Sequence, residues 1–359
     1  MTKLLAISTL QDLSVEKIHD RYSGWFLIDS FRRMGFTVTN RPEGELFVSF
    51  EHNHNSLRQF KKKGINPQNC ILIRVETDSV YPAQYRPRMN QEYELIFSPG
   101  STRSIQNRLK LLKHPYVYQS SPTSPSSSDS NLIDILAKNL ENGIYDFEKW
   151  RQRPIGLSMI AANKVSSQGD NNYQLRRDAV RLLGPSILST YGPLWDKGGF
   201  QKLKHRLAVA KFALSSGIKP NMSQIYGNLH WRYANNMGVV KDKHVILQQS
   251  KYSLVIENSQ RAVTEKLFDC LVNGSLPVYY GPDLSQFDFD EELIYRITDL
   301  HQIERMIGGG DNEEIRRKLS KVREFVTSPD FLDEWSAENV MKIIFEEIVK
   351  HFDLEKKGV

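Results

Sequence analysis

Cysteine is scarce in this chain, and long apolar runs are missing from it. Only two of its 359 residues are cysteines, Cys70 and Cys270, which is too few for a disulfide framework. Both lie in apolar strand or helix contexts, so we expect packed free thiols and a cytoplasmic, reducing location. No apolar run approaches the ~20 residues that span a bilayer, and the N-terminal apolar stretch meets polar and acidic residues too early for a signal peptide.

Large blocks of one charge sign are also missing. The net charge is +6 and the isoelectric point is about 9.0, with the densest positive groups at 61–63 and 202–211. A positive surplus suits anionic ligands such as a nucleotide diphosphate, an anionic membrane surface or nucleic acid. No zinc-finger, RNA-recognition or helix-turn-helix pattern accompanies it, so we expect no nucleic-acid partner. Solvated helix faces remain the plainer interpretation of both groups.

Strand-like and helix-like segments alternate along the chain, which is typical of α/β domains with parallel sheets. We expect a first domain over 1–150 and a second over 151–335. The Ser/Pro-rich segment 119–130 cannot build a core and is expected to form a loop of the first domain. An amphipathic helix within 336–359 is expected to pack back on the first domain, with a peripheral membrane-surface contact as the weaker alternative.

The most informative segment is 251–282. It predicts a buried strand over 252–256, a helix opening near Thr264, and a second buried strand over 276–280 that ends at Gly281-Pro282. Strand, helix and strand in about thirty residues form one βαβ unit of a parallel sheet. The polar residues after the first strand therefore lie at its carboxyl end, where open α/β sheets bind ligands.

The same segment resembles the α-1,3/4-fucosyltransferase family. The resemblance is carried by Glu257-Asn258-Ser259, by VTEKLFD at 263–269 and by GSLPVYYG at 274–281, in order and with the family's gaps. It spans some thirty positions, which is far more specific than a lone glycine motif. One departure is Ala262, because the family often has Tyr directly before its VTEK string.

The resemblance implies a GT-B arrangement, with two Rossmann-like domains and a cleft between them. It implies that the N-terminal domain engages the acceptor and that the C-terminal domain holds the GDP-sugar. The expected activity is inverting transfer of fucose from GDP-fucose to a saccharide hydroxyl, of the α-1,3/4 type, by a soluble, bacterial-type member. Two alternatives stay open: the same fold with another GDP-hexose or an unusual acceptor, and a non-catalytic protein that binds a polyanion or nucleotide.

Glu265 and Lys266 lie at the start of a predicted helix that follows a strand, and helix N-termini attract phosphates. Lys266 adds a point charge for the departing diphosphate, and the Glu265 carboxylate can accept hydrogen bonds from ribose hydroxyls. A structural role is also open, because Glu in a first turn favours the helix dipole and Thr264 is a plausible N-cap. Glu257 and Asn258 are expected to lie beside the nucleotide.

Arg176 follows Leu175 at the start of a predicted helix. The resemblance implies an Arg that opens this helix and binds the diphosphate, and Arg176 fits that position better than Arg177. A surface ion pair with Asp178 or a neighbouring acidic residue is the structural alternative.

Glu76 follows the apolar run 71–75 and so lies at the carboxyl end of a first-domain strand. It resembles the strand-end Glu that acts as the family's proposed general base. Inverting transfer needs one such base to take the proton of the attacking hydroxyl, and the diphosphate leaving group needs no second carboxylate. Asp78 is the alternative base, and a Glu that caps a loop is the structural alternative.

No metal site is expected. His52 and His54 have no third ligand nearby, and the acidic run at 283–290 lacks the spaced pair that metal-dependent transferases use. We therefore expect no required cofactor, and a divalent metal is expected to be at most stimulatory.

Overall fold

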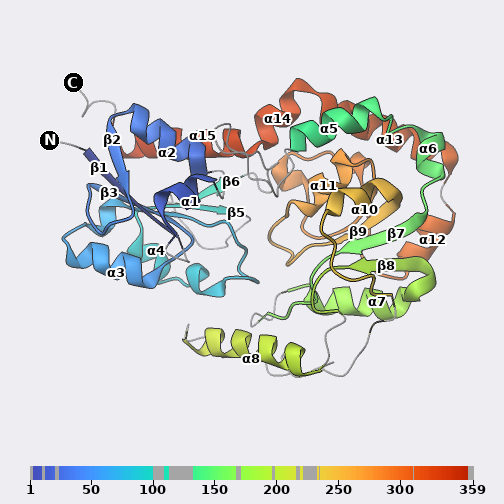
Figure 1. Ribbon diagram of the computed structural model, residues 1–359, viewed down its shortest axis with the longest axis horizontal. Coiled ribbons are helices and arrows are strands. Elements are labelled where there is room, and N and C mark those ends of the chain that lie inside the picture. The colour runs from blue at the N-terminus through green and yellow to red at the C-terminus, as the bar shows by residue number, and fades with distance from the viewer. Residues whose placement is uncertain are drawn as a thin grey trace. The chain divides into compact units, whose positions relative to one another are not determined.

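The computed structural model divides by its internal contacts into two units (Figure 1). The first unit joins Met1–Leu132 to Pro329–Val359, and the second unit is Ile133–Ser328. The residues that the structure describes are 3–9, 13–20, 24–99, 109–112, 132–166, 171–195, 199–215, 219–220, 233, 235–309 and 311–354.

A parallel sheet forms the centre of the first unit. Its strands are β1 (Lys3–Thr9), β2 (Phe36–Thr39), β3 (Leu46–Phe50), β4 (Cys70–Ile73), β5 (Leu95–Pro99) and β6 (Leu109–Leu112). They pair in the order β2-β1-β3-β4-β5-β6, with every neighbouring pair parallel. The helices and 3₁₀ turns of this unit are α1 (Val15–Asp20), α2 (Gly24–Arg33), α3 (His54–Lys62), η1 (Pro67–Asn69), η2 (Pro82–Tyr85), α4 (Met89–Glu92), α14 (Pro329–Trp335) and α15 (Ala337–Phe352).

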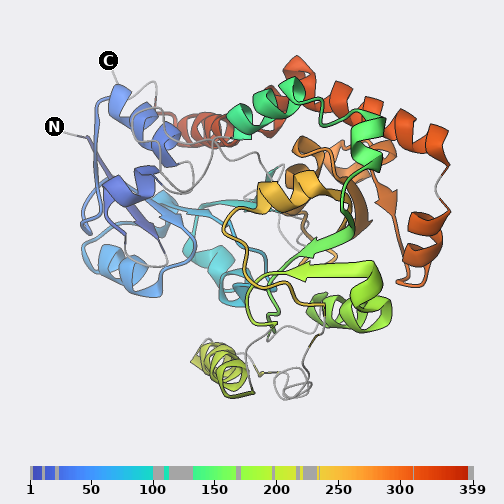
Figure 2. The same ribbon diagram turned by 45° about the vertical axis from the view of Figure 1, so that its right-hand side comes forward.

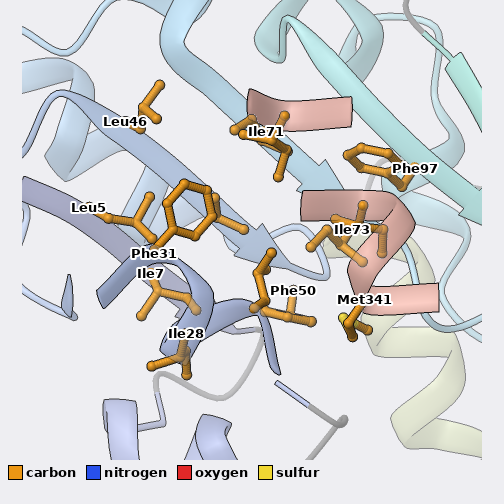
Figure 3. Close-up of a cluster of buried hydrophobic side chains, with 14 of the residues drawn as sticks. Leu5, Ile7, Ile28, Phe31, Leu46, Phe50, Ile71, Ile73, Phe97 and Met341 are labelled. Atoms are coloured by element: carbon orange, nitrogen blue, oxygen red, sulfur yellow. The ribbon is translucent and has the colours of Figure 1, made fainter. Parts of the chain in front are cut away.

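The sheet of the first unit is buried on both faces. Successive side chains of a strand point to opposite faces, so each strand contributes to two cores. Phe50 and Ile73 lie in one core, which α2 and α15 cover (Figure 3). Phe47 and Leu72 lie in the other, against α3. The unit is therefore layered as helix, sheet and helix.

The C-terminal helix α15 completes the first of these cores. Its buried core residues are Val340, Met341, Ile344, Ile348 and Val349. The ring of Phe345 lies edge-on to that of Phe31 on α2, with centroids 5.2 Å apart. Both ribbon views show α15, in dark red, beside the blue α2 (Figures 1 and 2). Ser336 caps the start of α15, since its Oγ accepts a hydrogen bond from the Asn339 N–H at 3.0 Å.

The second unit has a sheet of its own. Its strands are β7 (Ile155–Ile160), β8 (Leu188–Tyr191), β9 (Ser250–Ile256), β10 (Leu276–Tyr280) and β11 (Tyr295–Arg296). They pair in the order β11-β10-β9-β7-β8, again all parallel. The helices and turns are α5 (Leu132–Glu141), α6 (Phe147–Arg151), α7 (Tyr173–Ile187), α8 (Gly199–Ser215), α10 (Lys243–Gln249), α11 (Lys266–Val272), η3 (Ser285–Phe287), η4 (Glu291–Leu293), α12 (Gln302–Gly308) and α13 (Asn312–Thr327). The predicted strand–helix–strand segment is thus confirmed as β9, α11 and β10.

The segment around α5 and α6 packs on the second unit. The Tyr145 hydroxyl donates to the Val272 carbonyl at 2.8 Å, and the Trp150 indole N–H donates to the Lys251 carbonyl at 2.9 Å. The boundary expected at residue 150 therefore lies later in the chain than the division by contacts. The Ser/Pro-rich loop predicted at 119–130 lies outside the described residues.

In each sheet the strand order changes direction at the first strand of that sheet, because later strands are added on both sides of it. In the first unit β1 lies between β2 and β3, and in the second unit β7 lies between β8 and β9. The predicted α/β class with two Rossmann-like units is confirmed. Open sheets of this kind bind ligands at the carboxyl ends of the strands, next to the reversal. None of the helices in the described ranges is long and apolar enough to cross a membrane.

Candidate functional site

The turn between β9 and α11 is held together by a buried carboxylate. Glu257 follows β9 directly and its side chain is fully buried. It accepts hydrogen bonds from the Thr264 N–H at 2.8 Å and from the Thr264 hydroxyl at 2.6 Å. Burial raises the pKa of the Glu257 carboxyl, while Lys266 and the two Thr264 contacts lower it. Glu257 therefore fixes the conformation of the polar turn that contains or contacts the predicted donor residues.

Lys266 is the cation of this turn. Its Nζ donates to the Thr264 hydroxyl at 2.6 Å and lies 4.0 Å from the Glu257 carboxylate, and the side chain is 21% exposed. Glu265 precedes it at the start of α11 without a side-chain capping bond. The Lys266 ammonium is thus held in place by a hydroxyl and a buried carboxylate, and part of the side chain remains accessible to solvent.

A pocket of about 240 Å³ opens at the carboxyl edge of the second sheet. Ala161 and Ala162 after β7, Gly192 after β8 and the first turn of α11 contribute to its lining. Its charged residues are Lys243, Glu265, Lys266 and Asp269. Lys243 pairs with Asp269 at 2.6 Å, and burial raises the pKa of that carboxyl while Lys243 lowers it. The pocket lies beside the reversal between β7 and β9, where the topology predicts a ligand.

Arg176, on α7, is buried against the end of β9. Its guanidinium donates to the Ile256 carbonyl at 2.6 and 3.1 Å and to the Asn258 amide oxygen at 2.8 Å. The backbone N–H of Asn172 donates to the Asn258 carbonyl at 2.9 Å. Arg176 and Asn258 thus form one hydrogen-bonded group, and Arg176 ties α7 to the same turn that Glu257 holds.

The structure separates the two arginine candidates. Arg177 is also buried, and its guanidinium donates to the Gln174 amide oxygen at 2.9 Å and to the Lys164 carbonyl at 2.9 Å. It therefore serves the loop after β7, whereas Arg176 belongs to the β9 turn. The surface ion pair considered for Arg176 is wrong, because Arg176 is only 3% exposed and its described bonds go elsewhere.

The predicted donor residues all lie around the segment between β9 and α11, residues 257–265, which we call the β9 turn, but their roles in it differ. Glu265 and Lys266 line the pocket. Arg176, Glu257 and Asn258 are tied by hydrogen bonds to the backbone and side chains that frame it. Within the described residues, the pocket is thus lined by two of the five and supported by the other three.

Glu76 lies in the first unit, in the turn after β4, and its side chain is exposed. Its backbone carbonyl accepts hydrogen bonds from the Gln84 amide at 3.1 Å and from the Tyr85 hydroxyl at 2.9 Å. Asp78, the alternative base, is only 7% exposed. The Glu76 carboxylate is thus accessible from solvent on a backbone held by two hydrogen bonds, whereas the side chain of Asp78 is buried.

Sequence reasoning missed the part played by Glu51. This residue follows β3, has the left-handed backbone angle φ 65°, and is 3% exposed. Its Oε1 accepts hydrogen bonds from the Val75 N–H at 2.8 Å and from the Glu76 N–H. Burial raises the pKa of the Glu51 carboxyl to about 8, although the two backbone bonds lower it. The available signal, a carboxylate directly after a strand-like run, is of the same kind as the one that pointed to Glu76, so it could not show that the Glu51 side chain turns inward.

The described residues contain no group of three or more His, Cys, Asp or Glu side chains that could hold a metal ion. His52 is buried and bonds Tyr93, and the side chain of Asp283 lies on the surface beside Ser285. Cys70 and Cys270 are both buried and free. Burial raises the pKa of the Cys70 thiol to about 12, which keeps it protonated and unreactive.

No model of a protein family matches this chain, and no curated protein matches it in sequence. Solved structures do match it in fold. An α1,3-fucosyltransferase structure with GDP has a TM-score of 0.54 and 15% identity over 98% of this chain and 91% of its own. Structures of Anabaena Alr3699/HepE, one with UDP and glucose and one with UDP-glucose, each have a TM-score of 0.52, at 9% and 10% identity, over 98% of this chain and all of theirs. The two-unit fold is therefore the one that glycosyltransferases of the GT-B type adopt.

Proposed function

We propose that this protein is an inverting glycosyltransferase that moves fucose from GDP-fucose to a hydroxyl of a saccharide. The observation that carries the proposal is the β9 turn, where Lys266 and Glu265 line a pocket and Arg176, Glu257 and Asn258 hold its frame. The fucosyltransferase-like string 257–281 builds this turn. The fold shared with an α1,3-fucosyltransferase that binds GDP supports the same donor.

In the proposed reaction, Lys266 contacts the diphosphate and Glu265 accepts hydrogen bonds from the ribose hydroxyls. The acceptor oxygen attacks the anomeric carbon from the face opposite the nucleotide, and the bond from that carbon to the diphosphate oxygen breaks. GDP leaves with the electron pair, and its developing charge is stabilised by the Lys266 ammonium. The proton of the acceptor hydroxyl passes to the Glu76 carboxylate.

The proposal includes no metal and no other cofactor. In the GT-B type of site, protein cations take the place of a bound divalent ion at the diphosphate. The paired Lys243 and the surface-reaching Lys266 supply positive charge to the pocket of the second unit. A cytoplasmic location is proposed on the strength of the two buried free cysteines.

A second candidate keeps the fold and the chemistry and changes the donor. Two observations favour it. Ala262 stands where the fucosyltransferase family often has Tyr, and it is 2% exposed, so a tyrosine ring contact with the nucleotide is absent at that position. The HepE structures, which share the fold, bind UDP and glucose or UDP-glucose. A different nucleotide-hexose is therefore the rival donor.

The deciding experiment is a calorimetric titration of the protein, without added metal, with GDP, GDP-fucose, GDP-mannose and UDP-glucose. We expect GDP and GDP-fucose to bind, and Lys266→Ala to weaken that binding by about 10- to 100-fold, the worth of one charge-assisted contact. Lys204→Ala, which removes an exposed lysine of α8, is the matched control and is expected to bind as the wild type does.

Thermal unfolding of both variants is measured as well, because Lys266→Ala removes the cation beside the buried Glu257 carboxylate and could lower stability. Tighter binding of UDP-glucose than of GDP-fucose would replace fucose by the rival donor. Equal GDP affinity in wild type and a folded Lys266→Ala would overturn the assigned site. If no nucleotide bound, the shared fold would reflect common ancestry only, and the protein would not use a nucleotide-sugar donor.

A further inference from the structure

A second pocket, in the first unit, is strongly basic. It has a volume of about 520 Å³ and lies where β3 leads into α3, opposite α4. We name it the α3 pocket, and its lining is His52, His54, Leu57, Arg58, Lys61, Lys62, Arg88, Met89 and Glu92. Its size falls within the range of pockets that hold small organic ligands.

The positive charge of the α3 pocket is largely uncompensated. Lys61 is the one cation in it that pairs with a carboxylate, because its Nζ contacts Glu92. Arg58, Lys62 and Arg88 make no ion pair with any described residue. Like charges that gather around a concave surface repel one another and focus a positive potential there, so this arrangement favours an anion inside.

His52 adds an unused polar atom to the wall. It is 4% exposed, its Nδ1 lies 2.9 Å from the Tyr93 hydroxyl, and its Nε2 makes no hydrogen bond in the described part of the chain. Burial and the surrounding cations lower the pKa of His52 to about 4, so the ring is neutral at pH 7. When Tyr93 donates to Nδ1, the Nε2 of the neutral ring carries its proton and offers an N–H donor.

The α3 pocket shares its supports with the loop of Glu76. The Gln84 side-chain amide accepts from the His52 N–H at 3.3 Å and donates to the Glu76 carbonyl at 3.1 Å. Glu51, directly before His52, holds the Glu76 N–H. One buried side chain therefore touches both the pocket wall and the backbone of the proposed base, which places the pocket on the acceptor side of the reaction.

We propose that the α3 pocket binds the anionic group, a carboxylate or a phosphate, of a charged acceptor saccharide. This inference rests on the proposed function, because it names the class of acceptor. Neutral sugar hydroxyls would leave three cations uncompensated, whereas a carboxylate or phosphate matches the planar fork of Arg58 or Arg88 and the point charge of Lys62. The protein thus glycosylates an acidic glycan.

The test is a calorimetric titration at low salt with methyl glucoside, methyl glucuronoside, methyl glucoside 6-phosphate and inorganic phosphate. We expect the carboxylate or the phosphate glycoside, or both, to bind at least tenfold more tightly than the neutral one, and the two arms tell which anion is preferred. The double variant Arg58→Gln/Lys62→Gln is expected to lose at least tenfold in that affinity. Lys63→Gln, an exposed lysine next in the chain that does not line the pocket, is expected to bind normally.

Each contrary result overturns the inference. Equal affinity for the neutral and charged glycosides, or unchanged affinity in the double variant, would show that the pocket does not select charge. Inorganic phosphate that binds as tightly as the phosphorylated glycoside would reduce the pocket to a site for simple anions. A GDP titration runs in parallel. GDP binding without binding of the charged glycosides would reject only the acceptor class. Binding of the charged glycosides without GDP binding would reject only the donor assignment.

Discussion

At the scale of single residues, the backbone of the proposed base depends on another carboxyl group. Glu76 was predictable because a polar residue after an apolar strand run marks the carboxyl end of a strand. The role of Glu51 was not predictable, because it depends on a left-handed backbone angle and on hydrogen bonds to the segment after a neighbouring strand. Sequence periodicity reports the strand and gives no sign of which carboxyl will turn inward.

The proton of Glu51 links stability to pH. In the folded chain the pKa of this carboxyl is about 8, against an ordinary value of 4.5, so between these values the folded state holds a proton that the unfolded chain has released. The stability from this group is fully present below about pH 4.5 and is lost as the pH rises through 8. The expected loss is at most about 1.4 kcal/mol per pH unit.

Glu51→Gln keeps the shape of the protonated side chain and removes the titration. We expect wild type and variant to have similar free energies of unfolding in urea at pH 5, and the variant to be the more stable at pH 8. The exposed Glu43→Gln is the control and should follow the wild type at both pH values. Parallel pH profiles for wild type and Glu51→Gln would show that the carboxyl is already ionised when folded.

The two candidate bases are separable by isosteric variants. Glu76→Gln is expected to lower the rate of transfer about 10²- to 10⁴-fold, because an amide cannot take the acceptor proton, while the affinity for GDP stays unchanged. Asp78→Asn is expected to keep most of the rate, since that side chain is buried. A larger loss in Asp78→Asn, measured with both variants folded, would move the base to Asp78.

At the scale of secondary-structure elements, local patterns predicted more than long-range packing. The β9–α11–β10 segment was predicted correctly because its strand, helix and stop signals are all local. The domain boundary was expected at residue 150, whereas α5 and α6 belong by their contacts to the second unit, through bonds from Tyr145 and Trp150 to residues more than a hundred positions later. The short β2 and β6 were missed, because polar residues interrupt both of them, whereas the equally short β4 is a continuous apolar run.

Helix α15 provides an internal comparison of buried and exposed side chains. Ile344 is fully buried in the core with α2, and its neighbour Ile343 is 42% exposed. We expect Ile344→Ala to lower the free energy of unfolding by about 2–5 kcal/mol through lost contacts and a cavity. Ile343→Ala should change it by less than about 1 kcal/mol. Equal losses in urea unfolding would mean that α15 does not contribute to this core in solution.

At the scale of the whole molecule, the division into two units suggests two unfolding steps. The proposed nucleotide site lies wholly in the second unit, and the core with α15 lies wholly in the first. We expect differential scanning calorimetry to resolve two transitions, one for each unit. GDP should raise the midpoint temperature of the second unit's transition by mass action. Ile344→Ala should lower the midpoint temperature of the first unit's transition. A single transition that shifts with both changes would show that the units unfold as one body.

The return of α15 to the first sheet also bears on how the chain is made. A ribosome releases residues 133–328 before 337–352, so the second unit can close its core while the first sheet still lacks one of the helices that cover one of its faces. Until then the part of this core that α15 covers, which includes Phe31 of α2, lacks the apolar side chains that α15 supplies. The unit whose synthesis starts first is therefore the one whose core is completed last, because that core waits for residues 337–352.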